Sequence, residues 1–110
     1  MLNMAMSRAA SGLLRALFER MGNPADRILL SEIHSVDWQS LTFAGERHVL
    51  SLRITGRGAA LVARHFTEGI EDAEFSIPGH IVADIAMCGA PSRALDGSVT
   101  LVVEALTVAE

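Results

Sequence analysis

The sequence predicts an α+β domain in which two helices pack on one antiparallel sheet. Two segments repeat apolar residues at helical spacing, and two other regions alternate apolar and polar residues as strands do. No strand–helix–strand unit shows the continuous apolar runs of a parallel sheet. The expected order is α-β-β-α-β-β with one extra short strand allowed, as two hairpins under two helices in a two-layer domain. The 110 residues are expected to form a single domain.

The first expected helix covers residues 4–21. Its apolar face consists of Met6, Ala10, Leu13, Leu14, Leu17 and Met21. Gly22 and Pro24 indicate where it ends, because Gly favours the position after a helix and Pro cannot continue one. Few arginines line its polar face, so we interpret it as a helix packed on the sheet rather than a transit peptide or membrane-surface helix.

Residues 27–54 are expected to form strands. Leu50, Leu52 and Ile54 alternate with polar residues, which is the period of a half-buried strand. A tight turn of type II′ is expected around Gly45. That register puts polar groups on the apolar face unless a bulge lies near Trp38. Residues 28–36 are then either a separate strand or the first half of a bent one.

The second expected helix covers residues 57–69, with Leu61, Val62, His65 and Phe66 on its inner face. A second hairpin is expected from residues 80–88 and 98–108. One of its apolar rows is Ile81, Ala83, Ile85 and Met87. The facing row is Val99, Leu101, Val103 and Ala105.

The reverse face of this hairpin mixes polar and apolar residues, whereas a solvated sheet face should be mostly polar. Val82, Val102, Leu106 and Val108 cluster toward one end of it. We therefore predict that this surface is an interface and that the protein is a homo-oligomer, most simply a dimer.

His80, Asp84 and Glu104 share the same face in the expected register, in which Glu104 lies opposite Val82 and diagonal to the other two. A histidine with two carboxylates is able to perform general acid–base catalysis or to hold a metal. Three ionisable residues on one strand face more often form a surface cluster of ion pairs than a functional site. No histidine or cysteine pair has the spacing of a metal site, so we predict none.

Gly56, Arg57 and Gly58 precede the second helix, where backbone N–H groups and the Arg57 side chain could bind an anion. The dinucleotide-binding motif is incomplete because Leu61 replaces its third glycine. We interpret the two glycines as turn residues. Cys88 could act as a nucleophile, but it is interpreted as a small apolar residue because no base adjoins it in the sequence.

Composition excludes several classes of protein. Half of the residues are apolar and the mean hydropathy is +0.34, so disorder is not expected. No apolar run is long enough to span a membrane, and arginines interrupt any secretory signal. The net charge of −4 and the scattered arginines argue against nucleic-acid binding. A single cysteine excludes an internal disulfide and is consistent with the cytoplasm.

The sequence shows no family resemblance. Our main hypothesis is a small cytoplasmic bacterial module for binding or assembly, without cofactor or catalytic activity of its own. The alternative is an enzyme or a protein that binds a small metabolite, with His80, Asp84 and Glu104 in a pocket near a subunit interface. A third hypothesis is regulation by an anion or nucleotide at Arg57.

Overall fold

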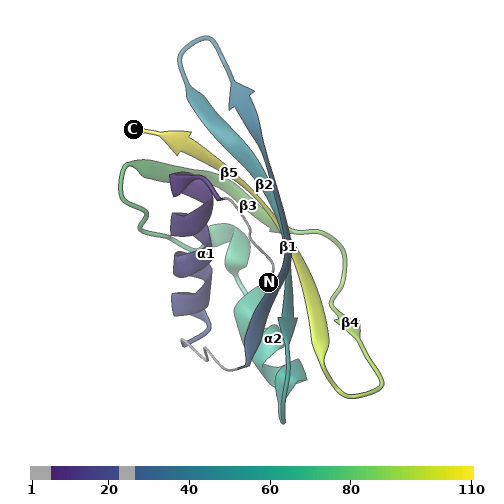
Figure 1. Cartoon of the computed structure of the whole chain (residues 1–110). Coiled ribbons are helices and arrows are strands. Elements are labelled where there is room, and N and C mark those ends of the chain that lie inside the picture. Colours follow the sequence, from purple (N-terminus) through teal and green to yellow (C-terminus); the bar gives the residue numbers. More distant parts are fainter. Residues whose placement is uncertain (1–5, 23–26) are drawn as a thin grey trace.

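The computed structural model describes residues 6–22 and 27–110 (Figure 1). Its elements are helix α1 (Arg8–Arg20), strands β1 (Ile28–Gln39) and β2 (Ala44–Ile54), helix α2 (Ala59–Thr67), the 3₁₀ turn η1 (Ile70–Asp72), and strands β3 (His80–Met87), β4 (Ser92–Arg93) and β5 (Val99–Ala109). The order α-β-β-α-β-β-β confirms the predicted α+β class, and β4 is the extra short strand.

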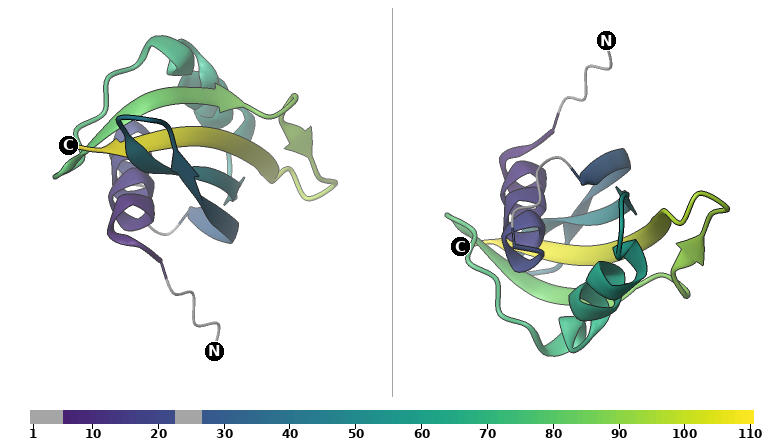
Figure 2. Two further views of the ribbon diagram at one scale, coloured as in Figure 1. Left: turned by 90° about the horizontal axis from the view of Figure 1, so that it is seen from above. Right: turned by 90° about the horizontal axis from the view of Figure 1, so that it is seen from below.

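All strands belong to one antiparallel sheet with the order β1-β2-β5-β3, and β4 pairs with the beginning of β5. The sheet is twisted, as Figures 1 and 2 show. The β1–β2 loop and the β4–β5 turn lie at opposite ends of the molecule. Its principal extents are 46 × 34 × 23 Å, so these two turns mark the ends of an elongated body.

Both helices pack on the same face of the sheet and share one apolar core with it. Leu13 and Leu17 of α1 and Phe66 of α2 are almost fully buried against β2 and β5. The sheet contributes the alternating residues Leu50, Leu52, Ile54, Val99, Leu101, Val103 and Ala105 to this core. The two apolar rows predicted for β2 and β5 are therefore confirmed, and no helix within residues 6–22 and 27–110 lies over the opposite face of the sheet.

Helix α1 begins later than predicted. Ser7 is its N-cap, and the Ser7 hydroxyl accepts a hydrogen bond from the Ala10 N–H. At the other end, Gly22 takes a left-handed conformation with φ of +82°, as expected of a residue that follows a helix. Residues 4, 5, 23 and 24, which the prediction also used, lie outside the described residues.

The predicted β1–β2 register is wrong. The chain turns at residues 40–43, where the Ser40 N–H donates to the Phe43 carbonyl, and not around Gly45. Gly45 instead pairs with Trp38 on one side and Val108 on the other. The bulge lies at Ser31 and not near Trp38, and β1 is one long strand. Only glycine fits at this position, because a side chain there would collide with the backbone of β5.

The predicted β3–β5 register is also wrong. Strand β4 lengthens the hairpin, which closes in the turn at residues 94–97. Glu104 consequently lies opposite Ala86 rather than Val82. A bulge at Ala83 interrupts the alternation of β3. It sends Ile81 to the open face of the sheet, while Val82 joins the periphery of the core.

Helix α2 also departs from the prediction in its inner face. Ala59, Ala63 and Phe66 are buried, whereas His65 and Leu61 are exposed. The short helix rotates so that its small residues approach the sheet. Within the described residues, no helix is long and apolar enough to cross a membrane.

Candidate interaction surface

The open face of the sheet is the surface on which a function can be sought, because both helices cover the other face. Register assigns its residues: Trp38 and Val36 of β1 lie beside Gly45 and Arg47 of β2, which lie beside residues 106 and 108 of β5. The face changes character along its length, from apolar near the β1–β2 loop to polar and charged farther away.

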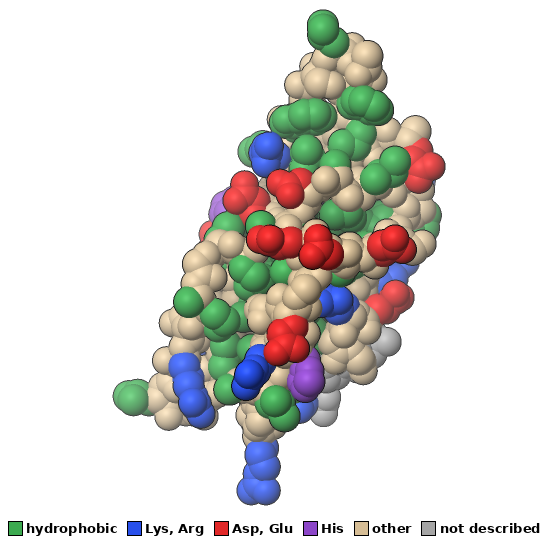
Figure 3. Space-filling view, turned by 180° about the vertical axis from the view of Figure 1, so that it is seen from behind, with side chains coloured by type: hydrophobic (Ala, Val, Ile, Leu, Met, Phe, Trp, Pro, Cys, Tyr) green, Lys and Arg blue, Asp and Glu red, His purple; other side chains and the backbone are tan. Residues whose placement is uncertain are grey.

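The apolar end of this face contains a hollow of about 260 Å³, which we call the apolar groove. Its walls are entirely apolar and consist of Trp38, Phe43, Ile81, Ala83, Leu106 and Val108. Phe43 and Ile81 are 57% and 54% exposed. Figure 3 shows hydrophobic side chains gathered toward this end of the molecule. An apolar hollow with large exposed side chains is typical of a surface that contacts another molecule.

A band of charged residues follows the groove along the open face. Arg47 Nη1 lies 3.7 Å from Glu104 Oε1, and the Cys88 thiol lies 3.5 Å from the other Glu104 oxygen. Partial burial and the neighbouring Glu104 carboxylate raise the pKa of the Cys88 thiol, which disfavours the thiolate. Cys88 is therefore poorly suited to be a nucleophile.

The three residues of the predicted acid–base cluster do not converge. The bulge at Ala83 puts His80 on the side of the sheet that faces the helices and Asp84 on the open face. His80 Nδ1 lies 3.1 Å from the Pro78 carbonyl oxygen, within its own turn. Glu104 lies with Arg47 and Cys88, several residues along the sheet. Asp84 is still diagonal to Glu104 on the open face, because it lies two residues from Ala86, whereas the predicted diagonal between Glu104 and His80 is absent.

Only two of the four residues of the predicted interface lie at the apolar groove. Leu106 and Val108 line the apolar groove. Val102 lies on the open face beside Ser51, farther along the strand. Val82 packs against the core and does not share this surface. Register therefore brings two of the four residues together and adds Trp38, Phe43 and Ile81, which the sequence pattern had not placed there.

The loop at Gly56, Arg57 and Gly58 has the geometry of a turn. Both glycines have positive φ, +84° and +76°. The Arg57 carbonyl oxygen accepts a hydrogen bond from the Arg27 guanidinium at 2.6 Å, and the Arg57 residue itself is exposed. The loop is thus fastened to the start of β1.

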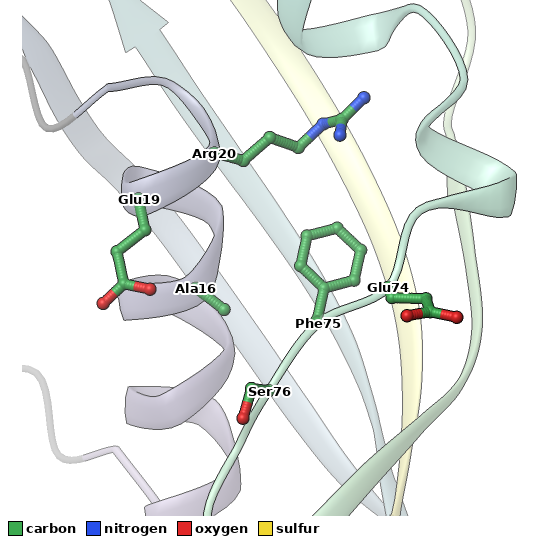
Figure 4. A pocket seen from close by; sticks show the side chains of 6 residues that line it. All are labelled: Ala16, Glu19, Arg20, Glu74, Phe75 and Ser76. Carbon is green, nitrogen blue, oxygen red and sulfur yellow. The ribbon is translucent and has the colours of Figure 1, made fainter.

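A second hollow lies between α1 and the segment that leads to β3 (Figure 4). The Phe75 ring points toward the Arg20 side chain, whereas the carboxylates of Glu19 and Glu74 point away from each other. The Arg20 guanidinium donates to the carbonyl oxygens of Phe66 and Glu68 and so joins the ends of the two helices. Within the described part of the chain, no three His, Cys, Asp or Glu residues are grouped to hold a metal.

One buried polar group was not singled out from the sequence. His48 is fully buried, with Nδ1 2.7 Å from the Ser35 hydroxyl oxygen and Nε2 2.8 Å from that of Thr107. Burial lowers the pKa of His48, and nearby His80 lowers it further, while Glu46 raises it. The signal was present in the sequence, since His48 continues the alternating row of Leu50, Leu52 and Ile54.

The fold and the surface together define a small two-layer α+β protein with one exposed sheet face. No protein-family model matches the chain, and no curated protein sequence matches it. A solved chain in the virion of a native gene transfer agent (GTA) particle has the same fold, with a TM-score of 0.62. The match covers 94% of this chain and 99% of that chain at 14% sequence identity, so the likeness is one of fold.

Proposed function

We propose that the chain is a structural subunit of a phage-like particle, which acts by assembly and has no catalytic activity of its own. The observation that carries the proposal is the apolar groove on the open sheet face of a fold shared with a GTA virion chain over almost the full length of both. Assembly in the cytoplasm of a bacterial cell, before particles are released, is part of this proposal.

The energetics of the open face support an interaction. Ile81 and Phe43 keep more than half of their surface in water, and Trp38 adjoins them. Burying one large apolar side chain fully contributes about 1.5–3 kcal/mol. Aromatic anchors seated in apolar hollows dominate the binding energy of many protein interfaces. Burial of these few side chains would therefore supply much of the binding energy for a partner that covers the groove.

The placement of ionisable groups favours assembly over chemistry. A catalytic site needs acid, base and substrate to meet in one concave place. Here His80 and Asp84 lie on different faces of the sheet, and the groove itself is lined by apolar residues only. The hollow has the shape and chemistry of a contact site.

The test is whether the chain is a constituent of particles. The gene is tagged in the cell that encodes it, particles are purified by sedimentation, and the chain is quantified by mass spectrometry. We expect it to cosediment with the particle proteins in a fixed ratio. Its absence from sedimented particles would refute the proposed function.

A pair of variants tests whether the groove mediates the contact. Ile81→Asp puts a charge in the groove, and Leu61→Asp puts one on the exposed face of α2, where the leucine is 58% exposed against 54% for Ile81. We expect Ile81→Asp to be lost from particles and Leu61→Asp to be retained. Thermal unfolding of both purified proteins controls for misfolding. Equal incorporation of the two variants would exclude the groove as the contact.

A further inference from the structure

The tip of the β4–β5 turn carries an apolar side chain with no protein around it. Leu95 is as exposed as a residue in an extended peptide, at 109%. A fully exposed leucine gains more from burial than any half-covered residue of the core rim. We call this side chain the knob, since none of the described residues covers it.

The turn that presents Leu95 is held rigidly. Asp96 accepts hydrogen bonds from the Ser98 N–H at 2.9 Å and from the Ser98 hydroxyl at 2.7 Å. Its other oxygen pairs with the Arg53 guanidinium at 2.9 Å. These bonds lower the pKa of Asp96, because they favour its charged form. A preorganised knob loses little conformational entropy on binding.

The apolar groove lies at the other end of the elongated molecule. Its residues adjoin the β1–β2 loop and the end of β5, whereas Leu95 lies at the beginning of β5. Figure 1 shows these two turns at opposite ends. The distance between knob and groove prevents a chain from filling its own groove.

The two ends also carry opposite charge. Around the knob, four arginines and one aspartate give a net charge of +3: Arg27, Arg53, Arg57, Arg93 and Asp96. Beside the groove, three acidic residues and one arginine give −2: Asp84, Glu104, Glu110 and Arg47. Figure 3 shows most basic side chains toward one end and the acidic ones across the middle and upper part. Such polarity favours a head-to-tail encounter.

We propose that the knob of one copy, Leu95, inserts into the apolar groove of a second copy of this chain. The proposal deepens the proposed function by naming the partner and the contact. The contact is heterologous, because knob and groove are different surfaces, and a contacting pair keeps one knob and one groove unused. Copies therefore add head to tail and form a ring or a filament, unlike the isologous dimer that a shared sheet face would form.

Complementation between two variants tests this geometry. Leu95→Ser removes the knob and keeps the groove, whereas Ile81→Asp spoils the groove and keeps the knob. We expect wild type to form oligomers larger than a dimer in sedimentation velocity, and each variant alone to associate about 10- to 100-fold more weakly. An equal mixture of the two should form a heterodimer and nothing larger, because only one intact contact is available.

Leu41→Ser is the matched control. Leu41 occupies the tip of the β1–β2 loop and is 104% exposed, so it is as accessible as Leu95 but lies at the groove end. We expect this variant to associate like wild type. Loss of association on Leu41→Ser equal to that on Leu95→Ser would refute a specific role of the knob.

Cross-linking tests the contact directly. In a Cys88→Ser background, Leu95→Cys and Ala83→Cys are made as separate single-cysteine proteins and mixed under mild oxidation. We expect disulfide-linked pairs between the two proteins and few pairs within either. Rapid pairing of Ala83→Cys with itself would show a groove-to-groove dimer and overturn the proposal. A wild type that stays monomeric at millimolar concentration would also overturn it, while particle incorporation still decides the proposed function separately.

Discussion

The buried histidine makes the stability of this protein depend on pH in a way that can be calculated. His48 is almost completely buried, and its two ring nitrogens contact the Ser35 and Thr107 hydroxyls. A neutral imidazole has one donor and one acceptor nitrogen, and hydroxyl groups complement both. Protonation would put a charge into the interior, which is why burial lowers the pKa of His48 below 6.5 in the folded state.

The sign of the effect follows from linkage. The unfolded chain binds a proton at His48 near pH 6.5, whereas the folded chain binds it only at lower pH. The stability that neutral His48 contributes is present above about pH 6.5 and is lost as the pH falls below it. The free energy of unfolding should therefore decrease by up to about 1.4 kcal/mol per pH unit between the unfolded and folded pKa values.

Substitution separates this contribution from all other titrations. His48→Leu removes the titrating group but leaves the Thr107 hydroxyl buried without its partner, at a cost of about 1–3 kcal/mol. The double variant His48→Leu/Thr107→Val removes both polar groups, so its cost should be well below the sum of the two single costs. Ser35 is exposed, and water replaces the histidine as its partner.

Urea unfolding followed by circular dichroism at about pH 8, 6 and 5 measures both effects. Above about pH 6.5 we expect a constant difference in the free energy of unfolding between wild type and the double variant. Below it, wild type should lose stability relative to the double variant. Parallel pH curves for the two proteins would refute the reasoning, because they would mean that the folded protein protonates His48 as readily as the unfolded chain does.

Three further outcomes are expected. Ser7→Ala removes the N-cap of α1 and should destabilise the protein by about 1 kcal/mol in urea unfolding, whereas Ser11→Ala within the helix should be neutral or stabilising. Gly45→Ala forces a side chain against the backbone of β5 and should lower the stability by about 1–3 kcal/mol, measured in the same way. Asp96→Asn removes a carboxylate that accepts hydrogen bonds from Ser98 and whose pKa is lowered in the folded state. In thermal unfolding, the variant should therefore lose less stability than wild type as the pH falls below about 3.8.

Periodicity predicted the class of fold and the strands that form its centre. The alternating rows of β2 and β5 could be assigned from the sequence because each has one buried face, and a slip by one residue would expose the whole row. The end of α1 near Gly22 also follows from local capping chemistry, whereas its predicted beginning lies too early, before the Ser7 N-cap. These features depend on neighbours in the sequence or on a strict repeat.

Pairing between strands could not be predicted in the same way. Gly45 resembles a turn residue in the sequence, yet it serves to let β5 approach closely within the sheet. The real turn contains the fully exposed Leu41, whose apolar character favoured a strand. Strand β4 is two residues long and too short to carry a pattern, but it moves the β3–β5 pairing and separates Glu104 from His80.

The bulge at Ala83 allows β3 to lose one residue without changing which side chains face the core. Ile85 and Met87 lie between the bulge and the closed end of the hairpin, so their pairing with β5 does not depend on the bulge. Deleting the single codon of Ala83 would join Val82 directly to Asp84 and restore regular alternation, so His80 and Val82 would still face the helices and Ile81 would stay on the open face. One in-frame deletion at this strand edge would thus leave the apolar groove and the packing of the helices and central strands in place.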